Sequence, residues 1–349
     1  MDPGFLLPVI LSRAKQQAGG YTHVSLGSFA RLRMTAAYPH PSNPFPSVKS
    51  VVKSNVDPRH HPLSLVKSPA LLLSFLALFF AAVMRAAPPE TTPAELPGAE
   101  SFLYRDGPVP LRLFVVKPDG WKATDRRPAL VFYFGGGWTT GTPASSIFWA
   151  KFAAKLGLVG IAPDYRTKGR FDTPPHAAVA DARASLRWVQ VHAAELGIDS
   201  TRIAVGGNSA GGHVALWTAL SSIPPGSDPA ESPLAKPAAL ILFSTVSDTS
   251  PLNGYTPKRF GADATALSPV HQLDATMPPV LAFHGDADKL VSVNQATALR
   301  DKLVATGNRC ELHLVPGGGH NFGNDVPEWR EKSRELMREF LKAQRLLLP

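Results

Sequence analysis

Apolar runs of strand length alternate with segments of helical periodicity from about Phe102 onward, and this alternation constrains the fold more than any other feature. Several strand-like runs are apolar on both faces, among them "PALVFYF", "LVGIAPDYR", "RIAVGG", "AALILFS" and "PPVLAFHG". Helical segments such as "HAAVADARASLRWVQVHAAELG" lie between them and end at a glycine. Strands buried on both faces and joined by helices predict a mostly parallel sheet covered on each side. The expected fold class is α/β, with one domain over residues 88–349.

One serine stands at a junction between such a strand and a helix. The stretch "GNSAG", Gly207 to Gly211, has the form G-x-S-x-G and separates "RIAVGG" from "SAGGHVALWTAL". Its glycines permit a tight turn that lifts the hydroxyl of Ser209 clear of its own backbone. The helix that follows offers free N–H groups and a partial positive charge to an oxyanion. The alternative is a small residue in a glycine-rich turn, so the nucleophile interpretation needs a base and an acid elsewhere.

Candidates for that base and acid follow two further predicted strands. "HGDAD" comes after "PPVLAF" and contains Asp286 and Asp288, whereas "PGGGHNF" comes after "CELHLV" and contains His320. Ligand sites in such sheets lie beyond the carboxyl ends of the strands, so these residues are expected beside Ser209. The residues alone leave open which of the two aspartates orients His320. The expected roles of His213 and His284 are structural.

A third requirement is a set of donors for the tetrahedral oxyanion. "FGGGW", Phe134 to Trp138, follows the predicted strand "PALVFYF". Consecutive glycines let backbone N–H groups point into a cleft without obstruction by Cβ atoms. The amides of Gly136, Gly137 and Ala210 are therefore the candidate oxyanion hole. A glycine-rich turn without this role is the alternative.

The ordered set "FGGGW", "PDYR", "GNSAGGH", "HGDAD" and "GGGHNF" resembles the α/β-hydrolase superfamily over roughly 111–341. It is most similar to compact esterases of the hormone-sensitive-lipase-like, acetyl-xylan-esterase-like and feruloyl-esterase-like groups. The resemblance implies that Ser209 is the nucleophile and His320 the base. The acid of the family's H-G-x-x-D turn is its fifth residue, which here is Asp288.

The resemblance also carries two expectations about supporting residues. Asp164 and Tyr165 of "PDYR" match a structural position at a strand end rather than a catalytic one. Phe134 departs from the family, which usually has a histidine before the glycine triplet. Because the oxyanion donors are backbone groups, the hole can survive this change, but the hydrogen bond by which that histidine would brace the loop needs a replacement.

The length of the segments around these motifs bears on the substrate. The stretch from residue 88 to 135 is too short for a substantial cap, and 247–274 is the one sizeable insertion, so we expect a hydrolase domain without a large cap. An open cleft favours short acyl groups on an accessible alcohol, such as acetyl groups on plant polysaccharide. Trp138, Tyr255 and Phe322 are candidates for stacking on the substrate. The expected chemistry uses no cofactor and no metal.

Two other functions remain open from the sequence. A prolyl-oligopeptidase-like serine peptidase shares the G-x-S-x-G and H-G-x-x-D turns, but it normally needs a large N-terminal propeller that this chain does not contain. A non-catalytic hydrolase fold that serves as a binding module is the second alternative. The complete set of serine, histidine and aspartate argues against it.

The first part of the chain differs in composition from the rest. Residues 1–87 carry nine basic and two acidic side chains, so +7 of the formal charge of +9 lies there and the body is nearly neutral. Binding to nucleic acid is therefore not expected. The single cysteine, Cys310, excludes an internal disulfide and a Cys-rich metal site. The sequence does not fix the oligomeric state.

A short apolar run from Ala70 to Met84 follows Lys67 and precedes small residues. It is shorter than the ~20 residues of a bilayer span, and residues 66–87 are predicted to be a secretory signal peptide. We therefore expect a secreted or periplasmic protein without stable membrane insertion after cleavage. Residues 1–65, rich in Pro, Ser and His, are predicted to be a disordered extension. An alternative is a start codon assigned too far upstream, with Val66 as the true start.

Overall fold

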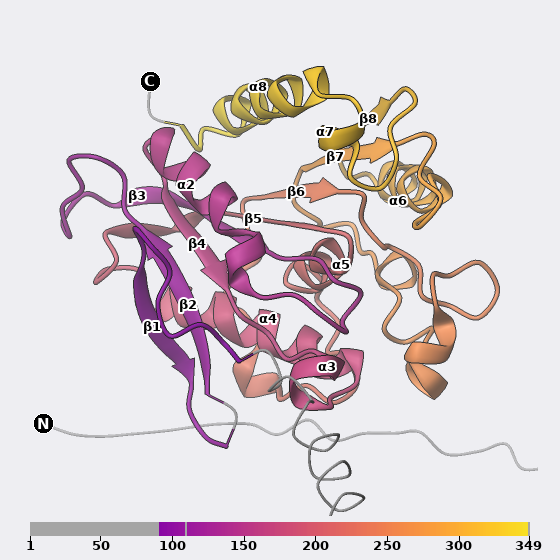
Figure 1. Cartoon of the computed structure of the whole chain (residues 1–349), viewed down its shortest axis with the longest axis horizontal. Helices are drawn as coiled ribbons and strands as arrows, with labels where there is room; N and C mark the ends of the chain where they lie inside the picture. Colours follow the sequence, from indigo (N-terminus) through magenta and orange to yellow (C-terminus); the bar gives the residue numbers. More distant parts are fainter. Residues whose placement is uncertain (1–90, 109, 348–349) are drawn as a thin grey trace, which may run out of the picture. The chain divides into compact units, whose positions relative to one another are not determined.

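Eight strands form one sheet in the order β1-β2-β4-β3-β5-β6-β7-β8 within residues 91–108 and 110–347, which the computed structural model describes (Figure 1). The strands from β4 to β8 are parallel, whereas β1 and β2 run antiparallel to their neighbours. Their bounds are β1 Glu100–Arg105, β2 Leu111–Val116, β3 Arg127–Tyr133, β4 Val159–Pro163, β5 Ile198–Asn208, β6 Ala239–Phe243, β7 Val280–Gly285 and β8 Cys310–Val315. The α/β class with a mostly parallel sheet is confirmed.

Helices cover both faces of this sheet. Alternate side chains of β3 point to opposite sides: Val131 belongs to the core under α4, α5 and α6, whereas Leu130 and Phe132 belong to the core under α2 and α8. This period of two is what a strand buried on both faces requires. The helices are α2 (Ile147–Lys155), α3 (Lys168–Phe171), α4 (Pro175–Val191), α5 (Ala210–Trp217), α6 (Asn294–Ala305), α7 (Phe322–Asp325) and α8 (Glu328–Ala343), with short 3-10 turns between some of them.

The order of the strands reverses at β3, and this reversal places the site. β3 pairs with β4 on one side and with β5 on the other, in a register that sets Tyr133 beside Gly207. The glycine loop after β3 and the serine turn after β5 therefore begin next to each other. A switch point of this kind is where parallel sheets open a crevice for ligands.

The structure contains the quoted strands, β3 to β8, and the quoted helices, α4 and α5, but the sequence reasoning missed β1. β1 is an edge strand with an exposed or half-exposed side chain at each position, so it lacks the apolar run by which the others were found. No helix in the described ranges is both long and apolar enough to cross a membrane. The predicted signal peptide and the extension before it lie outside the described residues.

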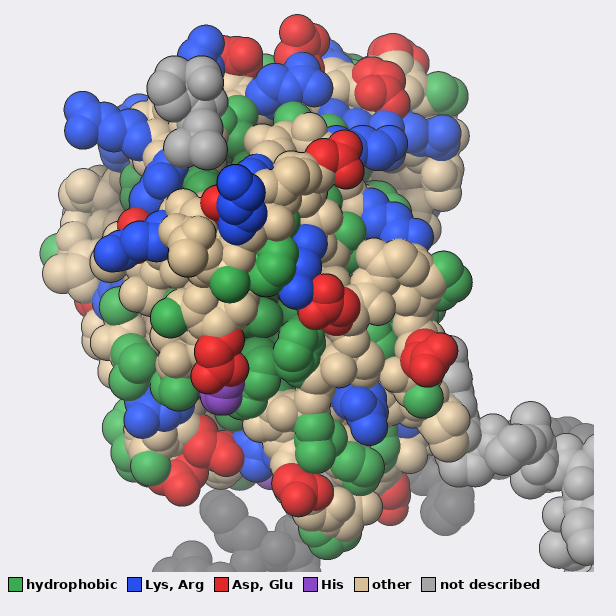
Figure 2. Space-filling view, turned by 90° about the vertical axis from the view of Figure 1, so that its left-hand side faces the viewer, with side chains coloured by type: hydrophobic (Ala, Val, Ile, Leu, Met, Phe, Trp, Pro, Cys, Tyr) green, Lys and Arg blue, Asp and Glu red, His purple; other side chains and the backbone are tan. Residues whose placement is uncertain are grey.

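The described surface mixes both charge signs. On the face shown in Figure 2, Lys and Arg side chains are interspersed with Asp and Glu side chains, and apolar areas lie between them. Such a mixture gives no extended field of one sign on this face.

Candidate active site

Ser209 occupies a strained turn directly after β5. Its backbone has φ 54° and ψ −120°, a region that non-glycine residues adopt at a cost. A Cβ atom on Gly207 would lie 2.3 Å from the backbone of Gly211, so the two glycines let the strand and the helix approach. The Ser209 N–H donates to the carbonyl oxygen of Phe243 at 2.9 Å. The carbonyl oxygen of Ser209 accepts from the backbone N–H of His213 at 3.2 Å. The turn thus has the geometry of a nucleophile elbow.

The carboxylate of Asp288 holds the ring of His320. Nδ1 of His320 lies 2.8 Å from Oδ2 of Asp288, whose side chain is fully buried. The other oxygen of this carboxylate accepts from the backbone N–H groups of Leu290 and Val291, each at 2.9 Å. Because Asp288 engages Nδ1, Nε2 on the far side of the ring is the nitrogen that remains for proton transfer.

A second imidazole lies beside the same carboxylate. Nε2 of His284 donates to the carbonyl oxygen of Val291 at 2.8 Å and is 3.3 Å from Oδ2 of Asp288. Burial lowers the pKa of His284, which favours the neutral ring. His284 therefore braces the turn after β7, the structural role expected from the sequence.

Asp286 has a different partner. Its Oδ1 accepts from the backbone N–H of Gly317 at 2.7 Å, which ties the loop after β7 to the loop after β8. Of the two aspartates, Asp288 is thus the one that contacts His320. The resemblance distinguished them, whereas the pattern of residues alone did not.

Ser244 is a positioning residue that sequence reasoning missed. Its hydroxyl donates to the carbonyl oxygen of His320 at 2.9 Å, and its own backbone has φ 44°. It comes directly after β6, at the same carboxyl edge of the sheet as the other site residues. That position was the signal by which it could have been found.

The loop after β3 turns sharply beside Ser209. Gly136 has φ 121°, and its carbonyl oxygen accepts from the N–H groups of Thr139 and Thr140, each at 3.0 Å. A Cβ atom on Gly136 would lie 2.2 Å from the carbonyl oxygen of Thr140, so no larger residue fits. The side chain of Arg259 donates to the carbonyl oxygen of Gly137 from the facing insertion.

Phe134 and Tyr165 brace this loop in place of the family's usual histidine. Their rings stack at 4.0 Å between centroids with an angle of 6°. The Tyr165 hydroxyl donates to the carbonyl oxygen of Phe134 at 2.6 Å. Asp164 is buried and forms an ion pair with Arg170 at 2.6 Å, so both "PDYR" residues support the loops, as predicted.

A cavity of about 560 Å³, here called the catalytic cavity, joins these elements. The residues of the site that line it are Gly136, Gly137, Ser209 and His320, and Tyr255, Arg259 and Leu290 also contribute. Tyr255 and Arg259 come from the 247–274 insertion, which therefore forms one wall of the cavity.

The three aromatic candidates for substrate contact have different places. Tyr255 lines the catalytic cavity, and Phe322 lines a neighbouring one. The expectation for Trp138 was wrong: its side chain is 1% exposed and packs edge-on against His213 and Phe260. The backbone of Trp138 has φ 58°, and this turn after the glycine triplet directs its side chain into the core.

Neither a second catalytic histidine at His213 nor a cluster of metal ligands is found in the described residues. Nε2 of His213 donates to the carbonyl oxygen of Leu267 at 2.8 Å, and burial lowers the pKa of His213 to about 4. The ring is therefore neutral and turned away from proton transfer at neutral pH. Across residues 91–347, where described, no three His, Cys, Asp or Glu side chains gather as ligands for a metal ion.

Comparisons with known proteins agree with this geometry. The model of the α/β-hydrolase fold family matches residues 130–324. The carboxylesterase NlhH of Mycobacterium tuberculosis is 31% identical over 259 residues, which cover 68% of this chain and 78% of NlhH. The probable carboxylic ester hydrolase LipM of the same organism is 31% identical over 198 residues, and the match spans about half of it, 46%.

Solved structures of esterase 2 from Thermogutta terrifontis are also similar. The butyrate-bound form has a TM-score of 0.68 and 36% identity over 73% of this chain and 97% of the esterase. The propionate-bound form has a TM-score of 0.66 and 37% identity over the same shares. The chain belongs to the α/β-hydrolase fold family, and these relatives are carboxylic ester hydrolases and esterases.

Proposed function

We propose that this protein cleaves short-chain acyl esters through a covalent acyl-enzyme, with Ser209 as nucleophile, His320 as base and Asp288 as orienting acid. The observation that carries the proposal is the bond of 2.8 Å between His320 and buried Asp288, beside a cavity that Ser209 also lines. A serine hydroxyl is a poor nucleophile unless a base takes its proton. The three groups follow β5, β7 and β8, so the sheet itself brings them together.

In the first step the Ser209 oxygen attacks the ester carbonyl while Nε2 of His320 takes the hydroxyl proton. Asp288 stabilises the resulting imidazolium through Nδ1. The oxyanion develops beside the amides of Gly136, Gly137 and Ala210. Ala210 is the first residue of α5, so its N–H has no acceptor within the helix and points from the positive end of the helix dipole.

The carbon–oxygen bond to the alcohol then breaks, and His320 gives its proton to the departing oxygen. In the second step His320 takes a proton from water, whose oxygen attacks the acyl carbon on Ser209. The acid leaves, and Ser209 regains its proton from His320. No redox change occurs in either step.

Short acyl groups are supported by two observations. Tyr255 and Arg259 of the insertion line one side of the catalytic cavity. Esterase 2 of Thermogutta terrifontis, which this chain resembles over 97% of that protein, has been solved with propionate and with butyrate. We therefore expect acetyl to butyryl esters to be the best substrates.

Hydrolysis of p-nitrophenyl acetate and butyrate tests the activity. Ser209→Ala is expected to lower kcat by about 10⁶-fold, the loss seen when a serine nucleophile is removed. Ser145→Ala is the matched control, because Ser145 lines the same cavity but donates its hydroxyl to the carbonyl oxygen of Thr142 at 2.8 Å. Equal activity of wild type and Ser209→Ala contradicts the proposal. Cleavage of peptides without ester turnover favours the peptidase alternative, and binding without turnover favours the binding module.

Acetylated plant polysaccharide is the more specific substrate that we propose. The ring of Phe322 in the neighbouring cavity supports it, whereas the burial of Trp138 removes one of the three aromatic rings expected to stack on sugars. Release of acetic acid from acetylated xylan, at a rate comparable with p-nitrophenyl acetate, supports this substrate. If p-nitrophenyl acetate is hydrolysed but acetylated xylan is not, the substrates of the protein are simple esters.

Secretion is a separate proposal that rests on the sequence of residues 66–87. N-terminal sequencing of the native protein tests it. A mature chain that begins near residue 88, found outside the cytoplasm, supports the signal peptide. A mature chain that retains residues 1–65 contradicts both the signal peptide and the later start at Val66.

A further inference from the structure

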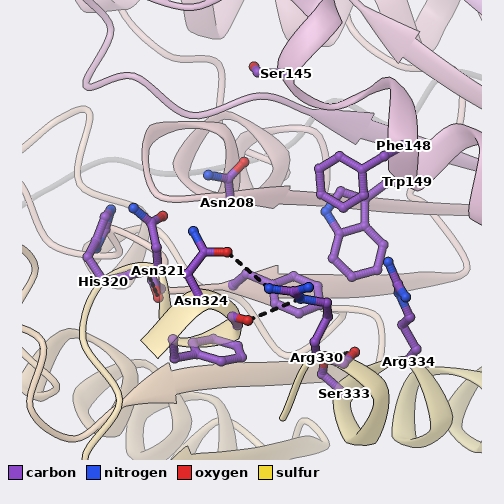
Figure 3. A pocket seen from close by; sticks show the side chains of 14 residues that line it. Ser145, Phe148, Trp149, Asn208, His320, Asn321, Asn324, Arg330, Ser333 and Arg334 are labelled. Atoms are coloured by element: carbon purple, nitrogen blue, oxygen red, sulfur yellow. Dashed lines mark hydrogen bonds between the residues drawn. The ribbon is translucent and has the colours of Figure 1, made fainter. Parts of the chain in front are cut away.

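A second cavity of about 590 Å³ adjoins the catalytic cavity, and we call it the adjoining cavity. The two share four lining residues: Ser145, Asn208, His320 and Asn321. Figure 3 shows His320 and Asn321 on one side of this cavity and Phe148, Trp149, Arg330 and Arg334 on the opposite side. The adjoining cavity is thus continuous with the site and extends from His320 toward α2 and α8.

Aromatic rings form much of its wall. Phe148 and Trp149 come from α2, Phe243 ends β6, and Phe322 begins α7. Phe148 is 47% exposed, and its ring lies 5.0 Å from that of Trp149, so an apolar surface faces the cavity. These side chains suit an apolar or aromatic group.

Two arginines from α8 line the side of the cavity opposite His320. Arg334 forms an ion pair with Glu331 at 2.6 Å. Arg330 donates from Nε to the carbonyl oxygen of Gly323 at 3.1 Å, and to the Asn324 side-chain oxygen at 3.4 Å (Figure 3). Both acceptors of Arg330 are neutral, and no carboxylate of the described residues lies within 4 Å of its guanidinium.

Arg330 links α8 to α7 through Gly323 and Asn324, but its place in α8 is unfavourable for a cation. It lies in the first turn of α8, where the helix dipole favours acidic side chains and disfavours a cation. The guanidinium also lines the adjoining cavity and has only neutral acceptors, so its charge remains available to an anionic group there.

The chemistry of His320 decides which half of the substrate meets this cavity. In ester cleavage the imidazole gives its proton to the oxygen of the departing alcohol, so that oxygen must lie at His320. The adjoining cavity is lined by His320, Asn321 and Phe322 but not by Ser209 or the oxyanion loop. The catalytic cavity is lined by Ser209 and the oxyanion loop, which the proposed reaction places beside the carbonyl and its acyl group.

We propose that the adjoining cavity receives the alcohol half of the ester, and that Arg330 selects alcohols that carry an anionic group, such as a carboxylate. This inference rests on the proposed esterase function. The substrate class it names is an acyl ester of an alcohol, a sugar or a simpler one, that offers an apolar or aromatic face and carries a carboxylate at its far end. The arginine guanidinium matches that group because it binds carboxylates through two parallel hydrogen bonds.

The test uses acetate esters that differ in charge on the alcohol side. Two lengths are compared, 4-acetoxybenzoate and 3-(4-acetoxyphenyl)propanoate, each against its neutral amide. The ratio of kcat/KM for acid over amide is measured at low salt in wild type and variants, so the intrinsic reactivity of each ester cancels between proteins. For at least one length, Arg330→Gln is expected to lower this ratio about fivefold, the size of a solvent-accessible ion pair. Arg330→Lys is expected to retain part of the wild-type preference for the acid over the amide.

Arg338→Gln is the matched control, because Arg338 lies on the same helix, is exposed and lines neither cavity. Its ratio is expected to equal that of wild type. An equal loss on acid and amide in Arg330→Gln shows a structural role for Arg330 and overturns the inference, as does an unchanged ratio at both lengths.

A second pair of esters places the charge on the acyl side. Phenyl hydrogen succinate and phenyl butyrate are compared in the same variants, and their ratio is expected to be insensitive to Arg330→Gln. A change on this pair instead of the first assigns the cavity to the acyl half and overturns the inference. If wild type hydrolyses none of these esters, the proposed function itself fails. If wild type hydrolyses the esters but the Arg330 variants change none of the ratios, the inference fails and the proposed function stands.

Discussion

Ser244, directly after β6, donates a hydrogen bond of 2.9 Å from its hydroxyl to the backbone carbonyl oxygen of His320. The bond links two neighbouring loops at the carboxyl edge of the sheet and fixes the backbone that carries the proposed base. Because the ring of His320 is already held at Nδ1 by Asp288, the imidazole is constrained from both its backbone and its side chain. In the proposed mechanism Ser244 is therefore a positioning residue, which acts through His320 rather than by contact with reacting atoms.

Replacing Ser244 tests this positioning. Ser244→Ala is expected to lower kcat about fivefold with little change in KM, which corresponds to about 1 kcal/mol for one hydrogen bond. Ser244→Gly also removes the hydroxyl but suits the positive φ of 44°, so it is expected to lose the same activity at nearly wild-type stability. Steady-state kinetics and urea unfolding measure the two effects. A fully active Ser244→Gly variant contradicts the positioning role.

The two aspartates after β7 form a matched pair. Asp288→Asn is expected to lower kcat by about 10⁴-fold, because an amide no longer selects the tautomer in which Nε2 accepts a proton. Asp286→Asn weakens the acceptor for Gly317 and is expected to cost about 1 kcal/mol of stability while activity is largely retained. Kinetics with p-nitrophenyl butyrate compare them. If Asp286→Asn instead loses far more kcat than Asp288→Asn, Asp286 is the orienting acid.

Residues at strand ends could be predicted from the sequence, because a strand, its glycine turn and the next helix are local patterns. This is how Ser209, His320 and the two aspartates were placed. Residues that act across the fold left no local pattern: the hydroxyl of Ser244 and the guanidinium of Arg259 meet their partners only when distant loops pack together. Trp138 was misplaced because a positive φ turned an apparent cleft residue into the core.

Tyr165 is expected to act on the oxyanion loop through Phe134. Tyr165→Phe removes the donor to the buried Phe134 carbonyl and is expected to lower the free energy of unfolding by about 1 to 3 kcal/mol. It is also expected to lower kcat more than it raises KM, because the loop carries the oxyanion donors. Tyr133→Phe is the control: its buried hydroxyl donates to Ala182 at 2.8 Å, under α4 and away from the loop. Similar kcat losses in both variants would show general destabilisation instead.

Stability is expected to fall on mild acidification because of His213. Burial lowers the pKa of His213 from 6.5 to about 4, so between these values the unfolded chain binds a proton that the folded chain does not. The stability is fully present above pH 6.5 and is lost as the pH falls toward 4, by about 2 to 3 kcal/mol for this group. The lowered pKa of His284 acts in the same direction.

His213→Gln isolates that contribution, since an amide can still donate to the carbonyl oxygen of Leu267 but does not titrate. Urea unfolding at pH 7 and pH 4.5 is the measurement. The loss of stability between the two pH values is expected to be smaller in the variant than in wild type by about 2 to 3 kcal/mol. Equal losses in the two proteins show that His213 is not the group that titrates.

The most direct measurement of the account's central claim is the site at which a dialkyl p-nitrophenyl phosphate modifies the protein. Trypsin releases the segment 203–258, which contains Ser209, because the bond between Lys236 and Pro237 resists cleavage, and fragmentation of this peptide by mass spectrometry locates the phosphoryl group. The account predicts one adduct, on the oxygen of Ser209, formed much more slowly in His320→Ala because the base is lost. An adduct at another serine, or one on Ser209 that forms equally fast without His320, contradicts it.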